Sequence, residues 1–223
     1  MLNPRPKKRA SKLVPFIYPV TEKVRLLRSM TKPKRDFLST VLKRRSNRVF
    51  KELSKAHLSK LLWYSSKVIS LDIQKDGSIW FHRPIPSAGG LHPIDLIVYS
   101  RLYDKTGHFY YYNPLDHSLG KLLIDRSKSE PFLKHIEQII PLGEASIVWF
   151  VANGNRTYAK YHNPESLLWR DAGAYIYCFQ LVSEALNINS CPLGTLGQPF
   201  ITDMLRAGSS VFGVGGMLIG GRS

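Results

Sequence analysis

The segment Pro84–Pro93 reads PIPSAGGLHP and joins two strand-like stretches of the chain. The run Ser78–Arg83 precedes it, and the strongly apolar run Ile94–Tyr99 (IDLIVY) follows it. Proline fixes φ and glycine reaches conformations closed to other residues, so the three prolines and Gly89-Gly90 predict a sharply turned path. Because these glycines carry no side chain, a ligand could lie directly against the backbone. The simpler interpretation is a tight loop between two strands, and other segments decide between the two.

The composition predicts a folded protein of one large or two small domains. The chain has 223 residues, of which 43% are hydrophobic and 11% aromatic, enough to bury a sizeable core. No apolar run approaches the ~18 residues that a membrane span needs. The N-terminal sequence has no uninterrupted apolar region of a secretory signal. Cys178 and Cys191 form neither a metal-ligand pattern nor a disulfide framework, and we therefore expect a reducing, cytoplasmic setting and no metal site.

The net charge of +16 lies almost entirely in the N-terminal part of the chain. Residues 1–60 carry 18 Lys and Arg against 3 Asp and Glu, whereas the remaining 163 residues carry 14 against 13. We therefore predict a basic arm over residues 1–35 and one domain over residues 36–223. Such an arm attracts acidic partners, and an acidic peptide or subunit is the partner we expect. Nucleic-acid binding is disfavoured, because no aromatic residues interleave with the basic ones as stacking platforms.

The spacing of apolar residues predicts an α+β fold with a mainly antiparallel central sheet flanked by helices. Residues 67–77 and 189–198 are expected to form turns, the second of which contains glycines. The expected strands cover residues 79–83, 94–102, 107–112, 146–152 and 213–221, and the run at 146–152 (SIVWFVA) is typical of a central buried strand.

Helix starts are marked by capping residues. Asp36 and Ser54 are predicted caps, and the apolar stripe after Asp36 comprises Phe37, Leu38, Val41 and Leu42. A helix is expected to start at Ser129-Glu130-Pro131, and a short one to run from Pro199 to about Arg206. Asn163-Pro164-Glu165 predicts the start of a long helix that ends near Leu186. Because this helix is apolar over much of its surface, it is either the spine of the core or a dimer element.

A basic cluster follows the first of these helices. Guanidinium forks and a hydroxyl are the natural partners of phosphoryl oxygens. They are supplied here by Arg44, Arg45, Ser46 and Arg48, with Asn47 between them. The alternative is a solvated basic face at a helix end, where arginine also complements the helix dipole.

Three segments carry a resemblance to a known family: RRSNRVF at 44–50, PSAGGLHP at 86–93 and AKYHNPESLLWRDAGAY at 159–175. Over roughly residues 36–222 the chain resembles the FMN-dependent nitroreductase superfamily. Within it, the chain is most similar to the SagB-type dehydrogenases, which are azoline oxidases of thiazole/oxazole-modified peptide pathways. The resemblance implies a nitroreductase-like fold with FMN at a homodimer interface and the 164–186 helix as dimer core.

The resemblance also implies which residues bind FMN. Phosphate and ribityl contacts fall to Arg44, Arg45, Ser46 and Arg48, with Arg222 as a second phosphate charge. The flavin ring would lie along Pro86, Ser87, Ala88, Gly89, Gly90 and Leu91, and the pocket would be completed by Leu193, Gly194, Thr195, Leu196 and Gly197. The chain departs from the family in having Gly173-Ala174 where a histidine often follows the glycine. No cyclising domain is fused to it, so the biosynthetic partners are expected to be separate proteins.

Lys160 and Tyr161 match the catalytic pair of the resembled branch and displace His92 as candidate base. Converting an azoline into an azole removes two electrons and two protons, and FMN accepts a hydride while a base takes the other proton. A lysine with a pKa near ~10.4 is protonated at neutral pH, so it needs burial or cationic neighbours to act as base. Tyr161 could instead donate a hydrogen bond or relay the proton, and the sequence leaves open which of the two abstracts. Without the resemblance, the pair is an ordinary loop lysine and tyrosine.

Two other functions fit the same residues. A general NAD(P)H-dependent FMN reductase of nitro compounds or quinones needs the same pocket without the Lys160-Tyr161 pair. A flavin-free adaptor that docks a biosynthetic complex through the basic arm needs neither. An absorption spectrum separates the adaptor from the two flavoproteins.

Overall fold

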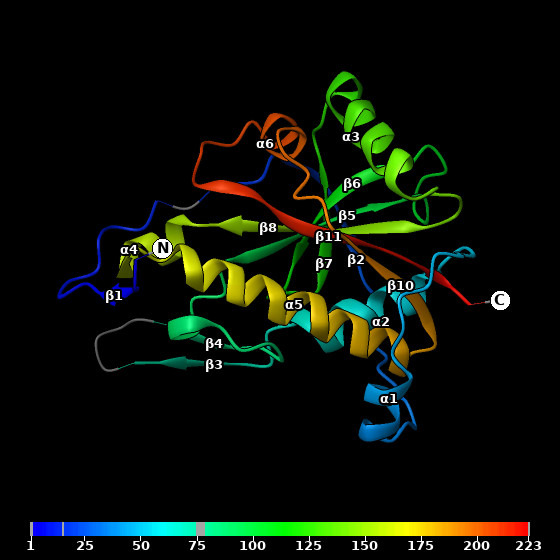
Figure 1. Cartoon of the computed structure of the whole chain (residues 1–223), viewed down its shortest axis with the longest axis horizontal. Helices are drawn as coiled ribbons and strands as arrows, with labels where there is room; N and C mark the ends of the chain where they lie inside the picture. The colour runs from blue at the N-terminus through cyan, green and yellow to red at the C-terminus, as the bar shows by residue number, and fades with distance from the viewer. Residues whose placement is uncertain (1, 15, 75–78, 223) are drawn as a thin grey trace.

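A seven-stranded antiparallel sheet forms the centre of the molecule (Figure 1). The computed structural model describes residues 2–14, 16–74 and 79–222. In spatial order the strands are β10 (Ile188–Leu193), β11 (Val211–Gly221), β8 (Ser146–Asn153), β5 (Ile94–Ser100), β6 (His108–Asn113), β7 (Ser118–Leu122) and β2 (Val20–Arg25). Two small antiparallel sheets flank it: β1 (Arg5–Pro6) with β9 (Tyr161–His162), and β3 (Ser70–Ile73) with β4 (Ile79–His82).

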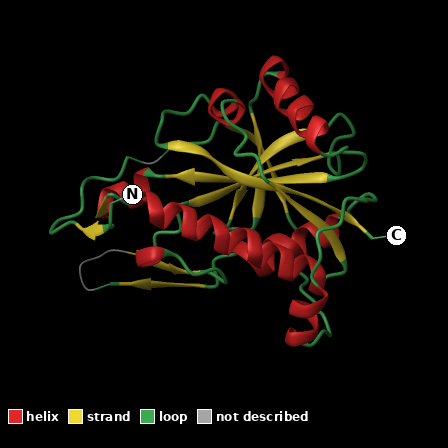
Figure 2. Cartoon of the chain, in the orientation of Figure 1, coloured by secondary structure: helices red, strands yellow, loops and turns green. Residues whose placement is uncertain are grey.

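Helices cover both faces of the large sheet, as Figure 2 shows. The long helix α5 (Glu165–Ala185) and α2 (Lys55–Ser66) lie on one face, whereas α3 (Arg126–Ile139) and α6 (Phe200–Leu205) lie on the other. The shorter elements are α1 (Phe37–Lys43), α4 (Asn155–Lys160) and the 3₁₀ turn η1 (Ala88–Gly90). The predicted α+β class with an antiparallel sheet is confirmed. None of the helices among the described residues is long and apolar enough to cross a membrane.

Strand β8 is buried on both sides, which explains its continuous apolar sequence. Successive side chains of a strand point to opposite faces. Val148 and Phe150 therefore belong to the core beneath α5 and α2, whereas Ile147 and Trp149 belong to the core beneath α3 and α6. A Cβ on Gly216 of β11 would lie 2.1 Å from the Trp149 ring, so a glycine there makes room for the indole. The central position predicted for residues 146–152 is confirmed.

Several helix boundaries follow the predicted caps. The carboxylate of Asp36 accepts from Ser39 N at the start of α1, and Ser54 Oγ accepts from His57 N at the start of α2. Two starts differ from the prediction. Asn163 has φ +52° and does not cap α5, which begins after Pro164. Helix α3 begins after Asp125, whose side chain accepts from Ser127 N, and it contains Pro131 instead of starting there.

The prediction missed elements whose sequences are short and polar. Strand β7 (SLGKL) and helix α4 (NRTYAK) were not expected, and β3 lies within the predicted turn 67–77. Residues 75–77 of that turn, and Ser78 at the start of the predicted strand Ser78–Arg83, lie outside the described residues. The predicted turn at 189–198 is wrong in its first half, because residues 188–193 form β10 and pair with β11.

The N-terminal segment is not separate from the domain. Strand β2 pairs with β7 as an edge strand of the central sheet, and Tyr18 and Leu26 are buried in the two cores. A boundary at residue 35 therefore does not divide the chain into an arm and a body. Deleting residues 1–35 would therefore remove β2, an edge strand of the central sheet.

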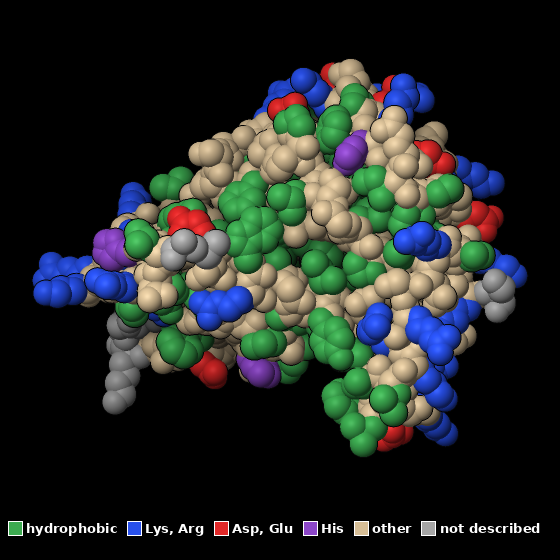
Figure 3. Space-filling view, in the orientation of Figure 1, with side chains coloured by type: hydrophobic (Ala, Val, Ile, Leu, Met, Phe, Trp, Pro, Cys, Tyr) green, Lys and Arg blue, Asp and Glu red, His purple; other side chains and the backbone are tan. Residues whose placement is uncertain are grey.

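The predicted apolar stripe of α1 lies on the surface of the chain. Phe37, Leu38 and Leu42 are 67%, 66% and 83% exposed. In the space-filling view hydrophobic side chains gather over α1 with Lys and Arg beside them (Figure 3). Within one chain, this stripe has no partner among the described residues.

Candidate active site

The predicted glycine loop turns through two left-handed residues and meets the Lys160-Tyr161 pair. Gly89 has φ +64° and Gly90 has φ +66°. A Cβ built on Gly89 would lie 2.7 Å from Tyr161 Oη and 3.4 Å from Lys160 Nζ. Two segments 71 residues apart, predicted separately as a ligand loop and a catalytic pair, are therefore in contact.

Ser87 is hydrogen-bonded to Asp171 of the long helix α5. Its Oγ donates to Asp171 Oδ2 at 2.5 Å and accepts from His92 N at 2.9 Å, while Ala88 N donates to Asp171 Oδ1 at 3.4 Å. Burial raises the pKa of Asp171, and the Ser87 hydrogen bond opposes that rise. Because its hydroxyl is engaged on both sides, Ser87 fixes the shape of the loop, and its sequence neighbours Gly89 and Gly90 form the turn.

His92 lies inside the loop and not at its surface. It is 4% exposed, its Nε2 lies 2.8 Å from Phe81 O, and its φ is +45°. Burial lowers the pKa of His92 to about 4, so the ring is neutral near pH 7. These contacts suit a histidine that ties the loop to β4.

Arg156 is a structural centre of the site that the sequence did not reveal. Its guanidinium binds both carboxylate oxygens of Asp95 at 2.9 and 3.1 Å and donates to His92 O at 2.8 Å. Tyr18 Oη donates to the same carboxylate at 3.0 Å. The signal that could have found this pair is an aspartate inside the apolar run IDLIVY, because a buried carboxylate needs a cationic partner.

Lys160 points its ammonium group across the loop. Its Nζ lies 3.5 Å from Gly89 O, at the limit of a hydrogen bond, and 5.4 Å from the centroid of the Trp80 ring. Trp80 is 49% exposed, so a face of its indole ring beside Lys160 is accessible to solvent or to a ligand; we call this ring the Trp80 wall. Lys160 and Tyr161 are both half-buried, which leaves them accessible to a ligand on the loop.

Part of the predicted phosphate cluster lines an open pocket of about 450 Å³ near the end of α5. The pocket is lined by Leu42, Lys43, Arg45, Asn47, Glu184, Asn189 and Arg222. Arg222 donates to Asn189 Oδ1 at 3.0 Å and pairs with Glu184, which also accepts from Arg35 at 2.8 Å. Two arginines share this one carboxylate, and Lys43 and Arg45 add charge, so the pocket is positive.

The other residues of the cluster do not line this pocket. Arg44 is half-buried and Arg48 is exposed. Ser46 Oγ accepts from Gln180 Nε2 at 3.3 Å, which places the cluster against the C-terminal half of α5.

One chain does not bring the glycine loop and the phosphate cluster together. The loop is bound to α5 at Asp171, whereas the cluster is bound at Gln180 through Ser46, and Arg222 is bound at Glu184. With 3.6 residues per turn, Asp171 and Gln180 project about 180° apart, and Asp171 and Glu184 are about 20 Å apart along the axis. The two groups therefore lie on opposite sides of the helix and towards opposite ends.

The predicted segment 193–197 contacts the face of the sheet covered by α3. Thr195 Oγ1 lies 2.9 Å from His135 Nε2 of that helix. A Cβ on Gly197, which has φ +74°, would lie 2.5 Å from the Trp149 ring, and Gly194 has open space around it. Leu193 is the last residue of β10 and is buried, while Leu196 is 44% exposed.

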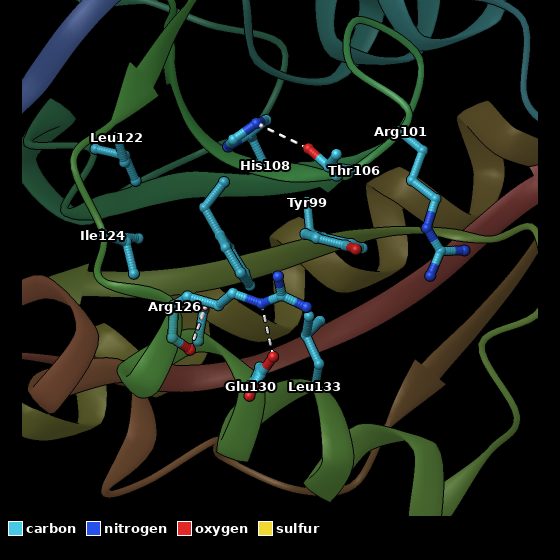
Figure 4. A pocket seen from close by; sticks show the side chains of 12 residues that line it. Tyr99, Arg101, Thr106, His108, Leu122, Ile124, Arg126, Glu130 and Leu133 are labelled. Atoms are coloured by element: carbon cyan, nitrogen blue, oxygen red, sulfur yellow. Dashed lines mark hydrogen bonds and ion pairs between the residues drawn. The ribbon is translucent and has the colours of Figure 1, made fainter.

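A second hollow contains none of the predicted site residues. It has a volume of about 630 Å³ between strands β5–β7 and the start of α3. Figure 4 shows Arg126 paired with Glu130 and Thr106 bonded to His108 along its rim. Because the Arg126 side chain is 88% exposed, this hollow is a surface groove and not a built site.

The two glycines of the loop provide a matched pair of substitutions. Gly89→Ala and Gly90→Ala impose similar left-handed backbone strain, about 1–2 kcal/mol each. Only the Gly89 methyl would meet Tyr161 Oη, because a Cβ on Gly90 has nothing within 4 Å. Both variants should melt a few degrees lower than the wild type. Only Gly89→Ala should displace the Lys160-Tyr161 pair and lower, by tenfold or more, the kcat of the reaction in which the pair takes part. Equal kcat values in the two variants would contradict the contact.

Comparisons with known proteins identify the fold. No protein-family model and no curated protein sequence matches the chain. A protein classed as a nitroreductase from Ralstonia eutropha JMP134 is 20% identical with a TM-score of 0.66, covering 100% of this chain and 99% of its own. Another from Anabaena variabilis ATCC 29413 is 17% identical with a TM-score of 0.60, covering 91% of this chain and 42% of its own.

A third similar structure comes from a synthetase complex. It is a chain of the Escherichia coli microcin synthetase McbBCD complex with truncated pro-MccB17 bound. It is 15% identical with a TM-score of 0.58 and covers 90% of this chain and 78% of its own. At these identities the likeness defines the fold alone: the chain has the nitroreductase fold.

Proposed function

We propose that the protein is an FMN-dependent oxidoreductase that oxidises azoline rings of a modified peptide to azoles. The observation that carries the proposal is the contact of Lys160 and Tyr161 with the glycine loop at Gly89. A proton-handling pair beside a bare, sharply turned backbone suits removal of a proton next to a flat cofactor ring. The nitroreductase fold and the similarity to a chain of the microcin synthetase complex support it.

The residues of the chain fit the two ends of FMN, its phosphate and its flat flavin ring, at two separate places. The positive pocket at Arg45 and Arg222, with Asn47 and Asn189 as amide donors, suits a phosphate. The loop at Ser87–Gly90 presents backbone and the Trp80 wall, which suits a flat ring. Bound FMN would supply a hydride acceptor.

We further propose that each FMN is held by two copies of the chain. Because the loop and the phosphate pocket lie on opposite sides of α5, the ring end of one copy would be completed by the phosphate end of the other. The exposed stripe of Phe37, Leu38 and Leu42 borders the phosphate pocket through Leu42 and offers an apolar contact surface. A C₂ dimer repeats such a contact twice and gives two identical sites.

In the proposed reaction the Lys160–Tyr161 pair takes one proton from the azoline ring, and bound FMN would accept the hydride that leaves with it. The ring gains one double bond, and dioxygen as the terminal oxidant would leave as hydrogen peroxide with the two electrons and two protons. Lys160 Nζ, in the neutral amine form that a base requires, and Tyr161 Oη are the atoms that would move the proton, while Gly89 O and the Trp80 ring contact the Lys160 side chain and orient it. The exposed side of Trp80 would cover the bound ring from water.

The proposed substrate also explains the basic surface. Arg5, Lys8, Arg9 and Lys12 are exposed, and no acidic residue occurs before Glu22. These cations would attract an acidic part of the peptide or of a separate partner protein towards the pair, more weakly at high salt.

The test uses the purified full chain and a synthetic peptide with one thiazoline and an acidic segment. We expect a yellow protein with flavin absorption bands and a peptide that becomes 2 Da lighter in air, with a KM that rises with salt. A yellow protein that ignores the peptide but rapidly oxidises NADPH with a quinone would replace the proposal by a general flavin reductase. A colourless, folded protein would leave only an adaptor role.

A further inference from the structure

The N-terminal segment Arg5–Ser11, which we call the strap, crosses the end of helix α4. Residues Arg5 and Pro6 pair with His162 and Tyr161 as strands β1 and β9. Lys7 N donates to Lys160 O at 2.9 Å, and Ser11 N donates to Ala159 O at 2.8 Å. The segment that carries the proposed catalytic pair is therefore bonded directly to a part of the chain more than 150 residues away.

The strap supplies hydrogen bonds that α4 lacks. The last four carbonyl groups of a helix have no partner within the helix. In α4 the carbonyl of Thr157 accepts from Tyr161 N, whereas the next three accept from the strap. The third of these bonds is from Lys7 Nζ to Tyr158 O at 2.7 Å. The Lys7 ammonium also complements the negative end of the helix dipole.

A helix as short as α4 needs such support. It has six residues, and isolated helices below ~12–15 residues are marginal in water. Its first turn is bound through Arg156, which donates to His92 O in the glycine loop. Its last turn reaches the same loop through Lys160 and helix α5 through Tyr158 Oη, which donates to Glu165 Oε1 at 3.0 Å, while the strap binds its backbone carbonyls. Both ends of α4 are thus fixed, and the strap fixes the end with the catalytic pair.

We propose that the strap positions Lys160 and Tyr161, with Lys7 and Ser11 as its positioning residues. The strap acts through backbone atoms and one ammonium group. Lys7 is half-buried, whereas the other side chains of the strap are exposed and are not needed for this role. The consequence for catalysis rests on the function proposed above, whereas the order imposed on residues 157–162 does not.

Ser11→Pro removes the backbone donor to Ala159 O. Ser11→Ala keeps that donor and, like Ser11→Pro, removes Oγ, which accepts from Lys7 Nζ at 3.1 Å. Ser11→Pro should speed hydrogen exchange of the amides in residues 157–162 by about tenfold, as expected for the loss of one hydrogen bond of about 1.4 kcal/mol. Ser11→Ala should exchange like the wild type, and peptides from β8 and α5 should be unchanged in both. Exchange into the whole chain, followed by digestion and mass spectrometry of the peptides, measures this, whatever reaction the protein catalyses.

Lys7→Ala and Lys128→Ala, the latter at an exposed lysine of α3, remove the same charge, but only Lys7 bonds to Tyr158 O. With the thiazoline peptide, Ser11→Pro and Lys7→Ala should lower kcat about tenfold at unchanged flavin absorption, and Lys128→Ala should keep it. Variants that lose flavin or melt far below wild type would assign the strap a merely structural role. Wild-type exchange and kcat in Ser11→Pro would overturn the proposal. If no variant oxidises the peptide but exchange still accelerates in Ser11→Pro, the proposed reaction fails and the strap's ordering role stands.

Discussion

Lys160→Ala is expected to leave the protein yellow and folded while lowering peptide oxidation by about 10²–10⁴-fold, the range of a general acid–base residue. The side chain lies on the glycine loop, with Nζ 3.5 Å from Gly89 O. It makes no contact with the phosphate pocket at the other end of α5. Flavin binding should therefore be retained, and the loss should fall on kcat. Single-turnover reduction of the bound flavin by the thiazoline peptide measures this step separately from reoxidation.

Two further variants test the assignment. Lys128→Ala removes an exposed lysine from α3, far along the chain from the loop, and should keep full activity. Tyr161→Phe keeps the ring and removes the hydroxyl that lies against Gly89. A larger loss in Tyr161→Phe than in Lys160→Ala would make the phenol the principal proton acceptor. Full activity in Lys160→Ala would remove the lysine from the mechanism.

Local sequence signals were sufficient to predict an element where the residues within that element determine its structure. The cap at Asp36, the buried run at 146–152 and the apolar length of α5 each followed from residues within one window. The pattern also located the PSAGG turn, because prolines and left-handed glycines restrict the backbone directly.

Pairings between distant segments could not be predicted in the same way. Strand β2 pairs with a segment about 100 residues away, and the strap is bonded to residues about 150 positions later. Nothing in RPKKRAS distinguishes a strap from a solvated basic arm, since its bonds are made by backbone atoms. The surface position of the α1 stripe could not be predicted for a related reason: apolar periodicity locates an apolar face, but not whether the same chain or a second copy covers it.

Subunit mixing tests whether each site is built by two copies. Arg45→Glu should reverse charge in the phosphate pocket and give a colourless, inactive protein, while Lys160→Ala stays yellow and inactive. A heterodimer of these two variants has one site with both defects and one site with neither. Purified through two different tags, it should recover about half of the wild-type activity per dimer.

The reciprocal heterodimer excludes the alternative. One copy is wild type, and the other carries both Arg45→Glu and Lys160→Ala. If each site draws its phosphate pocket and its catalytic pair from different copies, both sites of this dimer are defective and activity should be near zero. If each site lies within one chain, this dimer keeps half of the activity and the first one has none. The opposite sides of α5 at Asp171 and Gln180 predict the first pattern, and the reverse pattern would show that a single chain completes the site.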